Sequence, residues 1–284
     1  MSFEEKIQSL DGGRILAECG PMRLVIEAWI GRIPQRDQCV RAAKEAFVLL
    51  GKIARQRDIV SRRYAQVPGG LDDFQVLKMI RSVVAVDKDL TPMAAVAGTI
   101  SDGVASFLSN RGMTRVIVNN GGDLAVRTGS GGAVKVGIRP DLTRSEITHA
   151  INLGDERPRW GIATSGLEGR SLTRGVASAA TVIAGSASVA DAAATSVANS
   201  SYIDDETVLQ RPAQELDGFT DIPGVAVTVQ AGPFPEEKKE AALSGALQRA
   251  NTLIQKGLIY GACVAVDGKV AMTDFVRRRL VQLS

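Results

Sequence analysis

The sequence predicts an α+β fold in which an antiparallel or mixed sheet packs against long helices. Short apolar runs rich in valine and isoleucine follow one another along the chain, with glycine-containing turns between them. A few longer segments instead carry apolar residues at three- and four-residue spacing, which is typical of helices. Adjacent strands interrupted by a few long helices favour α+β layers over a doubly wound parallel sheet.

The first elements are two strands and two helices. Residues 14–30 predict a strand pair that is broken at Gly20 and Pro21, because these residues favour a turn. Residues 36–60 predict one helix, since apolar side chains recur there at helical spacing between charged ones. A shorter helix is expected over residues 73–86.

Two further predicted helices are poor in large side chains. The first starts near Thr91 and Pro92 and stops at Gly112. The second covers residues 186–200, which have helical composition, a single charge and no large side chain. Helices with such small surfaces can approach each other closely, so we expect the segment around Gly98 to lie against the second helix.

The clearest strand pattern lies in residues 114–140, where three apolar runs are separated by NNGG and GSGG. Glycine and asparagine permit the reversals between strands, so this segment predicts an antiparallel meander. Between the later strands a helix is expected from Pro235 to about Gly257. The last two strands are predicted to form a hairpin at Asp267–Gly268, and the later strands are expected over residues 160–166, 177–185, 224–230, 258–266 and 269–275.

Composition restricts the classes of partner. The chain has 284 residues, 45% of them hydrophobic, so it can bury a core. A net charge of +3 with only 4% aromatic residues does not predict a nucleic-acid surface. No stretch approaches the roughly 18 apolar residues of a membrane span, and the acidic N-terminal segment does not resemble a signal peptide. We therefore expect a cytoplasmic protein without nucleic-acid or membrane partners, whose three cysteines stay unpaired.

The common catalytic signatures are missing from the sequence. It contains neither a P-loop motif nor a dinucleotide-binding GxGxxG between a strand and a helix. The single histidine, His149, lies in a polar stretch that we expect between strands, and no neighbour recommends it as a base for a nucleophile. The sequence therefore identifies no catalytic residue.

Two polar, glycine-containing clusters follow predicted strands. NNGGD at residues 119–123 leaves backbone N–H groups open to an anion such as phosphate. The same pattern is also the commonest signal for a short hairpin turn. In the second cluster, Thr164, Ser165 and Gly166 offer two hydroxyl groups to a polar ligand, although the segment also fits an ordinary strand exit.

Asp191 and Thr195 present a third candidate site. Four residues apart on a helix, they share one face and offer a carboxylate and a hydroxyl oxygen, which suit Mg²⁺. A structural alternative stays open, because Ser188 and Asp191 also match a capping box. In that arrangement Asp191 accepts a hydrogen bond from the backbone of Ser188 at the start of the helix.

Taken in order, these segments resemble the ApbE family of magnesium-dependent FAD:protein FMN transferases. The resemblance covers residues 93–199 and rests on a glycine-containing helix, an N-x-G-G-D turn, an ATSG segment at 163–166 and an ADAAAT segment at 190–195. It implies a single ApbE-like domain over residues 1–284, with a C-terminal strand, helix and hairpin extension over 222–284. It also implies a layered α+β fold and a homodimer.

The resemblance assigns roles to individual residues. It implies that Asp191 and Thr195 hold Mg²⁺. It further implies that FAD or FMN is bound by residues of the glycine-containing helix, the turn and the ATSG segment: Gly98, Asn119, Gly121, Gly122, Asp123, Thr164, Ser165 and Gly166. The sequence departs from the family at Ala97, where members carry a lysine, and residues 167–189 lack the family's histidine and Asp-Pro segment.

The sequence leaves three functional hypotheses open. The first is transfer of FMN from FAD to an acceptor protein, with Mg²⁺ neutralising the diphosphate. The second is a non-catalytic flavin-binding or flavin-delivery protein, which needs the phosphorylated ligand but no base. The third is a different enzyme on the same scaffold, which holds an acidic substrate with Arg139, Arg170 or Arg174.

Overall fold

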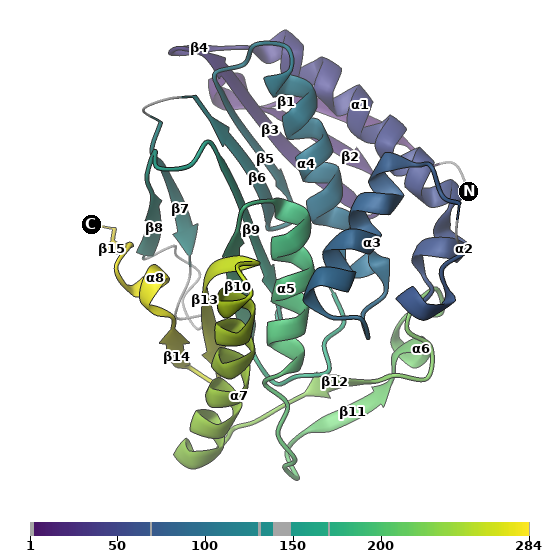
Figure 1. Ribbon diagram of the computed structural model, residues 1–284, viewed down its shortest axis with the longest axis vertical. Coiled ribbons are helices and arrows are strands. Elements are labelled where there is room, and N and C mark those ends of the chain that lie inside the picture. The colour runs from purple at the N-terminus through teal and green to yellow at the C-terminus, as the bar shows by residue number, and fades with distance from the viewer. Residues whose placement is uncertain (1–2, 69, 130–131, 139–148, 170, 284) are drawn as a thin grey trace. The chain divides into compact units, whose positions relative to one another are not determined.

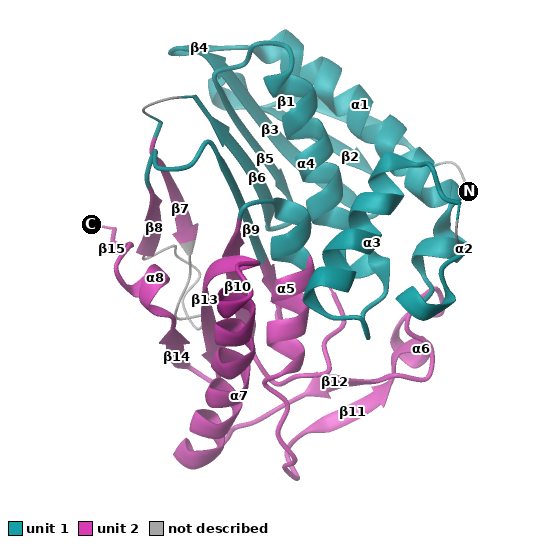
Figure 2. Ribbon diagram, viewed as in Figure 1, with its two compact units in different colours: residues 1–132, 154–163, 185–191 teal, residues 133–153, 164–184, 192–284 magenta. Residues whose placement is uncertain are grey.

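The computed structural model describes residues 3–68, 70–129, 132–138, 149–169 and 171–283 (Figure 1). The chain divides into two compact units (Figure 2). Unit 1 comprises residues 1–132, 154–163 and 185–191, and unit 2 comprises residues 133–153, 164–184 and 192–284.

Unit 1 contains an antiparallel sheet with the strand order β1-β2-β3-β5-β6-β9. A short strand, β4, pairs with the end of β3. The strands are β1 (Glu5–Ser9), β2 (Ile15–Cys19), β3 (Met22–Ile30), β4 (Ile33–Pro34), β5 (Arg115–Asn120), β6 (Asp123–Thr128) and β9 (Arg159–Ser165), the last of which ends in unit 2. The predicted strand pair over residues 14–30 is confirmed as β2 and β3, which meet at a turn where Gly20 has a φ of 55°.

The helices of unit 1 pack on its sheet and on one another. They are α1 (Arg36–Arg55), α2 (Arg57–Val60), α3 (Phe74–Val86) and α4 (Val96–Ser109), and a 3₁₀ turn at Pro92–Ala95 precedes α4. Figure 1 shows α1 and α4 side by side over the sheet, and both contact its strands. The prediction of a single continuous helix over residues 36–60 is wrong, because the backbone leaves helical geometry at Gln56 and a second helix, α2, follows.

The first turns of α3 and α4 differ in how their backbone N–H groups are satisfied. Asp73 caps α3, since its side chain accepts hydrogen bonds from the backbone N–H groups of Gln75 and Val76. The helix predicted over 73–86 is thereby confirmed. Ala95 precedes α4 and provides no such cap, so the start of α4 depends on groups from elsewhere in the chain.

The strands of unit 2 pair in three groups. The strands β10, β13 and β14 lie side by side, β8 lies between β7 and β15, and β11 pairs with β12. Their bounds are β7 (Val134–Ile138), β8 (His149–Leu153), β10 (Ala179–Ala184), β11 (Leu209–Pro212), β12 (Ala226–Gln230), β13 (Ile259–Val266), β14 (Lys269–Met272) and β15 (Leu280–Gln282). The hairpin at Asp267–Gly268 is confirmed, with both residues at positive φ.

The meander predicted over residues 114–140 is only partly correct. Its first two runs form the hairpin of β5 and β6. The third run is not the next strand of that sheet, because β6 pairs with β9 and β7 pairs with β8. His149 begins β8 and pairs with Ile138 and Gln282, so its predicted position between strands is wrong.

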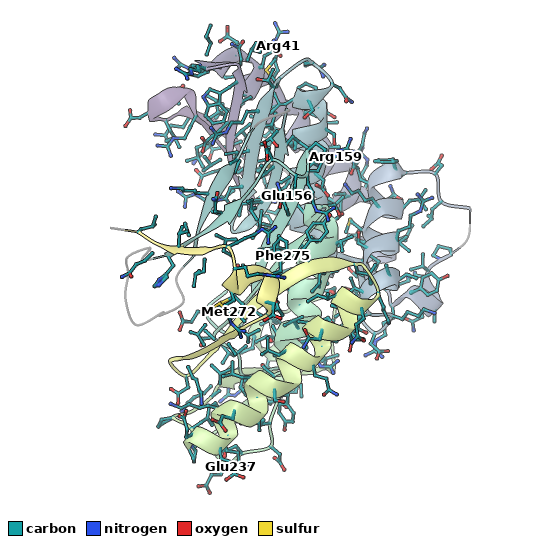
Figure 3. The ribbon with its side chains drawn as sticks, turned by 60° about the vertical axis from the view of Figure 1, so that its left-hand side comes forward. Arg41, Glu156, Arg159, Glu237, Met272 and Phe275 are labelled. Atoms are coloured by element: carbon teal, nitrogen blue, oxygen red, sulfur yellow. The ribbon has the colours of Figure 1, made fainter. Side chains whose placement is uncertain are left out.

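The helices of unit 2 are α5 (Ala187–Asn199), which begins in unit 1, α6 (Ala213–Leu216), α7 (Glu236–Gln255) and α8 (Asp274–Arg277). The predicted helix after Pro235 is confirmed as α7, which packs on β13. Figure 3 shows Phe275 of α8. The ring of Phe275 lies against that of Tyr260 of β13, with the centroids 5.8 Å apart. Among the described residues, no helix combines the length and the hydropathy that a membrane crossing requires.

The cysteine prediction is confirmed. Cys19, Cys39 and Cys263 are all buried and unbridged. Burial raises the pKa of the Cys39 and Cys263 thiols to about 11, so both stay protonated at neutral pH and act as small apolar side chains.

Candidate functional site

A tight turn between β5 and β6 forms one edge of the candidate site in unit 1. Asn120 pairs with Asp123, which leaves Gly121 and Gly122 as the two turn residues, with φ values of 65° and 115°. The Asn119 side chain accepts a hydrogen bond from the Gly122 N–H at 2.9 Å. The hairpin interpretation of NNGGD is therefore confirmed, and glycine satisfies the positive φ at both positions.

The turn is attached to the start of α4. The Asn120 side chain donates to the carbonyl oxygen of Ala97 at 3.3 Å. The Ser101 hydroxyl donates to the carbonyl oxygen of Asp123 at 2.9 Å. These two bonds hold the turn beside the first residues of α4, where the family resemblance places Gly98.

The start of α5 packs directly on the start of α4. A Cβ atom on Gly98 would overlap the carbonyl oxygen of Ala187, so only glycine permits this approach. Gly161 of β9 allows the same closeness to the backbone of Ser186. The expectation that two small-residue helices lie against each other is confirmed, and it is backbone atoms that meet.

The side chain of Asp191 of α5 lies at the N-terminal end of α4. Its Oδ2 atom accepts a hydrogen bond from the Gly98 N–H at 2.9 Å. Burial, and then the negative charge of Asp123, raise the pKa of Asp191 well above its usual value, although backbone N–H groups of Gly98 and Ala97 lower it. Asp191 and Asp123 thus form a pair of neighbouring carboxylates whose negative charges repel each other.

The capping-box interpretation of Asp191 is wrong. The backbone N–H of Ser188 donates to Asp102 of α4, at 3.1 Å, and not to Asp191. The Ser188 hydroxyl donates to the same Asp102 oxygen at 3.0 Å. A side chain distant in the sequence therefore takes the capping role at the start of α5, which leaves Asp191 to contact α4.

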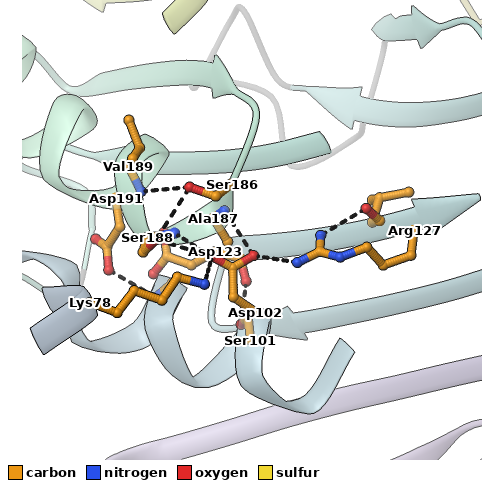
Figure 4. Close-up of polar contacts among 12 residues, drawn as sticks. Lys78, Ser101, Asp102, Asp123, Arg127, Ser186, Ala187, Ser188, Val189 and Asp191 are labelled. Atoms are coloured by element: carbon orange, nitrogen blue, oxygen red, sulfur yellow. Dashed lines mark hydrogen bonds and ion pairs between the residues drawn. The ribbon is translucent and has the colours of Figure 1, made fainter. Parts of the chain in front are cut away.

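Asp102 is the centre of a buried polar cluster (Figure 4). Its side chain is fully buried and forms ion pairs with Lys78 of α3 and Arg127 of β6, both at 2.8 Å. It also accepts the Ala187 N–H at 3.1 Å, in addition to the bonds from Ser188. Burial raises the pKa of Asp102, but the charges of Lys78 and Arg127 outweigh this effect and lower it overall. Asp102 therefore stays ionised.

Sequence reasoning missed this cluster. Asp102 is an acidic residue within a helix otherwise composed of small and apolar side chains. That isolation was a signal, because a charge is fully buried only where partners compensate it. Its partners lie 24 residues before it and 25 and more residues after it in the chain, so no local pattern identifies them.

The ATSG segment covers the end of β9 and the residue after it, and its last three residues lie in unit 2. The Thr164 hydroxyl forms a hydrogen bond with the Thr181 hydroxyl at 2.8 Å. The Ser165 Oγ atom is buried and has no hydrogen-bond partner among the described residues. Gly166 has a φ of 144°, and a Cβ there would overlap the carbonyl oxygen of Ser178. The segment thus leaves one buried hydroxyl group unsatisfied.

Thr195 lies one turn after Asp191 on α5, so the predicted helical spacing of the two residues is confirmed. Of the three arginines considered for an acidic substrate, Arg139 and Arg170 lie outside the described residues. The backbone of Arg174 is held by Asn199, whose side chain accepts the Arg174 N–H at 2.8 Å. Within the described part of the chain, no group of three or more His, Cys, Asp or Glu side chains is arranged to hold a metal ion.

The comparison with protein families agrees with the resemblance. A family model described as "AbpE bacteria" matches residues 7–272. A UPF0280 protein of Methanothermobacter thermautotrophicus is 30% identical over 72% of this chain and 85% of its own length. A UPF0280 protein of Methanopyrus kandleri is 37% identical over 74% and 86%. The apo structure of the flavinyl transferase ApbE from Pseudomonas stutzeri is 13% identical over 98% of this chain and 97% of its own, with a TM-score of 0.49.

Replacing Gly98 by alanine tests the contact between α4 and α5. We expect Gly98→Ala to lower the free energy of unfolding by about 3 kcal/mol, because the new methyl group overlaps backbone atoms that cannot rotate away. Gly51→Ala on α1 is the control, since its nearest neighbour is the Arg55 side chain at 3.8 Å. The control should gain roughly 0.5 to 1 kcal/mol from helix propensity. Urea denaturation measures both, and equal stability of the two variants would contradict the contact.

Replacing Asp102 by asparagine tests the buried cluster. We expect Asp102→Asn to cost about 3 to 5 kcal/mol at neutral pH, because it leaves Lys78 and Arg127 unpaired. The matched control is Glu18→Gln, which breaks an exposed ion pair with Arg23 and should cost less than about 1 kcal/mol.

The cluster also has a defined pH dependence. The folded-state pKa of Asp102 lies below its unfolded value, so its ionisation stabilises the fold above the unfolded pKa of about 3.9. That contribution is lost as the pH falls through the folded pKa. In urea denaturation, the difference between wild type and Asp102→Asn should therefore shrink below about pH 4. A difference that stays constant with pH would contradict the ionised state of Asp102.

Proposed function

The chain belongs to the family described as AbpE bacteria, and from this membership and the site in unit 1 we propose that it binds a flavin nucleotide, FAD or FMN, together with Mg²⁺. The observation that carries the proposal is the carboxylate pair of Asp191 and Asp123 beside the start of α4. FMN transfer from FAD to an acceptor protein is the activity proposed for this site.

The donor set fits a hard divalent cation. Asp191 is only half-buried and its charge is opposed by Asp123, so a cation would relieve both the repulsion and the loss of hydration. Thr195 offers a hydroxyl oxygen one turn further along α5. When bound, Mg²⁺ would supply positive charge for the diphosphate of the nucleotide.

Two of the residues proposed to hold the flavin nucleotide have features that suit a ligand: free space beside the backbone, and a hydroxyl group without a hydrogen-bond partner among the described residues. Apart from Gly122 and its two chain neighbours, no described residue has a heavy atom within 4 Å of the Cβ position of Gly122, so a ligand can approach the backbone of the turn closely. In unit 2, Ser165 has a buried hydroxyl group that still needs a hydrogen-bond partner. Each feature, within its own unit, supports binding of a polar ligand.

The proposed transfer is a phosphoryl substitution. The hydroxyl oxygen of an acceptor side chain forms a bond to the phosphorus of the FMN half of FAD, the diphosphate P–O bond breaks, AMP leaves, and the hydroxyl proton passes to solvent. Such a reaction depends mainly on positioning and electrostatics. The proposal therefore assigns Asp191, Thr195 and the Gly121–Gly122 turn to binding, and no residue of the chain to proton transfer.

Adding FAD and Mg²⁺ to the purified protein tests both ligand binding and FMN transfer. We expect FAD to raise the melting temperature, by an amount equivalent to about 2.7 kcal/mol at a concentration 100 times its Kd. With Mg²⁺ and a threonine-containing acceptor protein, AMP should appear by chromatography. Asp191→Asn should abolish AMP release without unfolding the protein, whereas the exposed control Asp58→Asn should release AMP at the wild-type rate.

Each outcome separates one hypothesis. FAD binding without AMP release would contradict transfer and leave a flavin-binding or flavin-delivery protein. No response to FAD, FMN or ADP at millimolar concentration would overturn the flavin proposal and leave an enzyme for an acidic substrate.

Mg²⁺ binding should depend on pH. The folded-state pKa of Asp191 is raised, so a fraction of this side chain is protonated at pH values where an ordinary aspartate is ionised. The cation requires the carboxylate and must displace that proton. We therefore expect the apparent Mg²⁺ affinity to increase with pH until the pH exceeds the pKa of Asp191, as measured by calorimetry in buffers of different ionisation enthalpy. An affinity that is constant over this range, with no proton release, would contradict Asp191 as a ligand.

A further inference from the structure

Unit 1 contains a pocket between α3 and the start of α5 that has no part in the proposed flavin and Mg²⁺ site. Its volume is about 300 Å³. It is lined by residues of both helices: Phe74, Lys78, Arg81, Ser82, Ser186, Ser188 and Val189. None of these residues is among those proposed above to bind the flavin or the cation.

The charge of the pocket is positive. Two of the lining residues, Lys78 and Arg81, are basic, and the described lining includes no acidic residue. They stand three residues apart on α3, so their side chains project from the same face of the helix. The remaining polar side chains of the lining are serines, and the hydroxyl of Ser188 already donates to Asp102, so the two basic side chains are the main groups for an anion.

The two basic residues differ in how they are held. Lys78 Nζ is fixed at 2.8 Å from Asp102, which uses one of its three donors, and its side chain is 25% exposed. Arg81 is exposed and takes part in no hydrogen bond or ion pair with another described residue. One cation is thus anchored, while the guanidinium of the other is available to a ligand.

The backbone at the start of α5 is already occupied. The N–H groups of Ala187 and Ser188 donate to Asp102, and the Val189 N–H lies 3.4 Å from the Ser186 hydroxyl. Recognition of an anion in this pocket therefore depends on side chains. Phe74 is 69% exposed and supplies an aromatic face beside them. Adjacent cations with a neighbouring ring match the phosphates and the base of a nucleotide.

We propose that this pocket binds the diphosphate of a nucleotide through Lys78 and Arg81, with the base on Phe74. Binding here requires no metal ion, because the positive charge comes from the side chains. Arg81 is the residue to change, since it has no hydrogen bond or ion pair with another described residue and its replacement leaves the Asp102 cluster intact.

The test is calorimetry of ADP, pyrophosphate and adenosine binding to the full chain in the presence of EDTA. We expect wild type to bind ADP, Arg81→Gln to bind it about tenfold more weakly, and Arg81→Lys to recover part of the loss. Arg41→Gln is the matched control, because Arg41 is an exposed arginine of α1 in the same unit (Figure 3). Phe74→Ala should weaken ADP and leave pyrophosphate unchanged.

Three results would overturn the proposal: no ADP binding by wild type, equal losses in Arg81→Gln and Arg41→Gln, or pyrophosphate bound as tightly as ADP. The last would indicate a site for free anions. Asp191→Asn separates this pocket from the proposed Mg²⁺ site, because ADP binding in EDTA should persist in that variant. If ADP binding in EDTA fails while FAD with Mg²⁺ still stabilises the protein, only the pocket assignment is wrong.

Discussion

The buried carboxylate of Asp102 is the interaction on which the arrangement of unit 1 depends. It joins α3 through Lys78, β6 through Arg127 and the first turn of α5 through two backbone N–H groups. A fully buried charge is tolerated only when hydrogen bonds and opposite charges compensate its lost hydration. Because the compensating groups come from three other elements, these elements have few alternative positions. The cluster therefore acts as a geometric constraint as much as a source of stability.

The same constraint explains why two nearby aspartates have opposite properties. Asp102 has two cations beside it, and they lower its pKa despite complete burial. Asp191 has a second carboxylate, Asp123, and its pKa is raised. Environments that move neighbouring carboxyl groups apart in pKa are common at functional sites, because one group keeps the structure while the other stays free to exchange its proton for a ligand. The contrast favours Asp102 as the structural residue and Asp191 as the functional one.

Local patterns in the sequence predicted those parts of the fold that local chemistry determines. The hairpin at Gly121–Gly122 needs residues that adopt positive φ, and the helix over 73–86 follows from apolar spacing, so both were visible. The prediction that the third apolar run pairs within the meander was wrong, because strand order depends on pairing between distant segments. The predicted capping box was wrong for a similar reason. Ser188 and Asp191 have the right spacing, but the N–H group of Ser188 donates to Asp102, 86 residues earlier in the chain. The positions of candidate site residues were thus predictable, but their partners were not.

The alanine and glycine surfaces of α4 and α5 connect these observations. Small side chains contribute little apolar area, so such a contact gains less hydrophobic stabilisation than one between leucines would. The contact instead allows α4 and α5 to come so close that the backbone of Ala187 packs against Gly98. At that separation the Asp102 carboxylate reaches the first N–H groups of α5, and the Asp191 carboxylate reaches back to the Gly98 N–H of α4. Each helix thereby receives an acid from the other at its start, where the helix dipole favours negative charge.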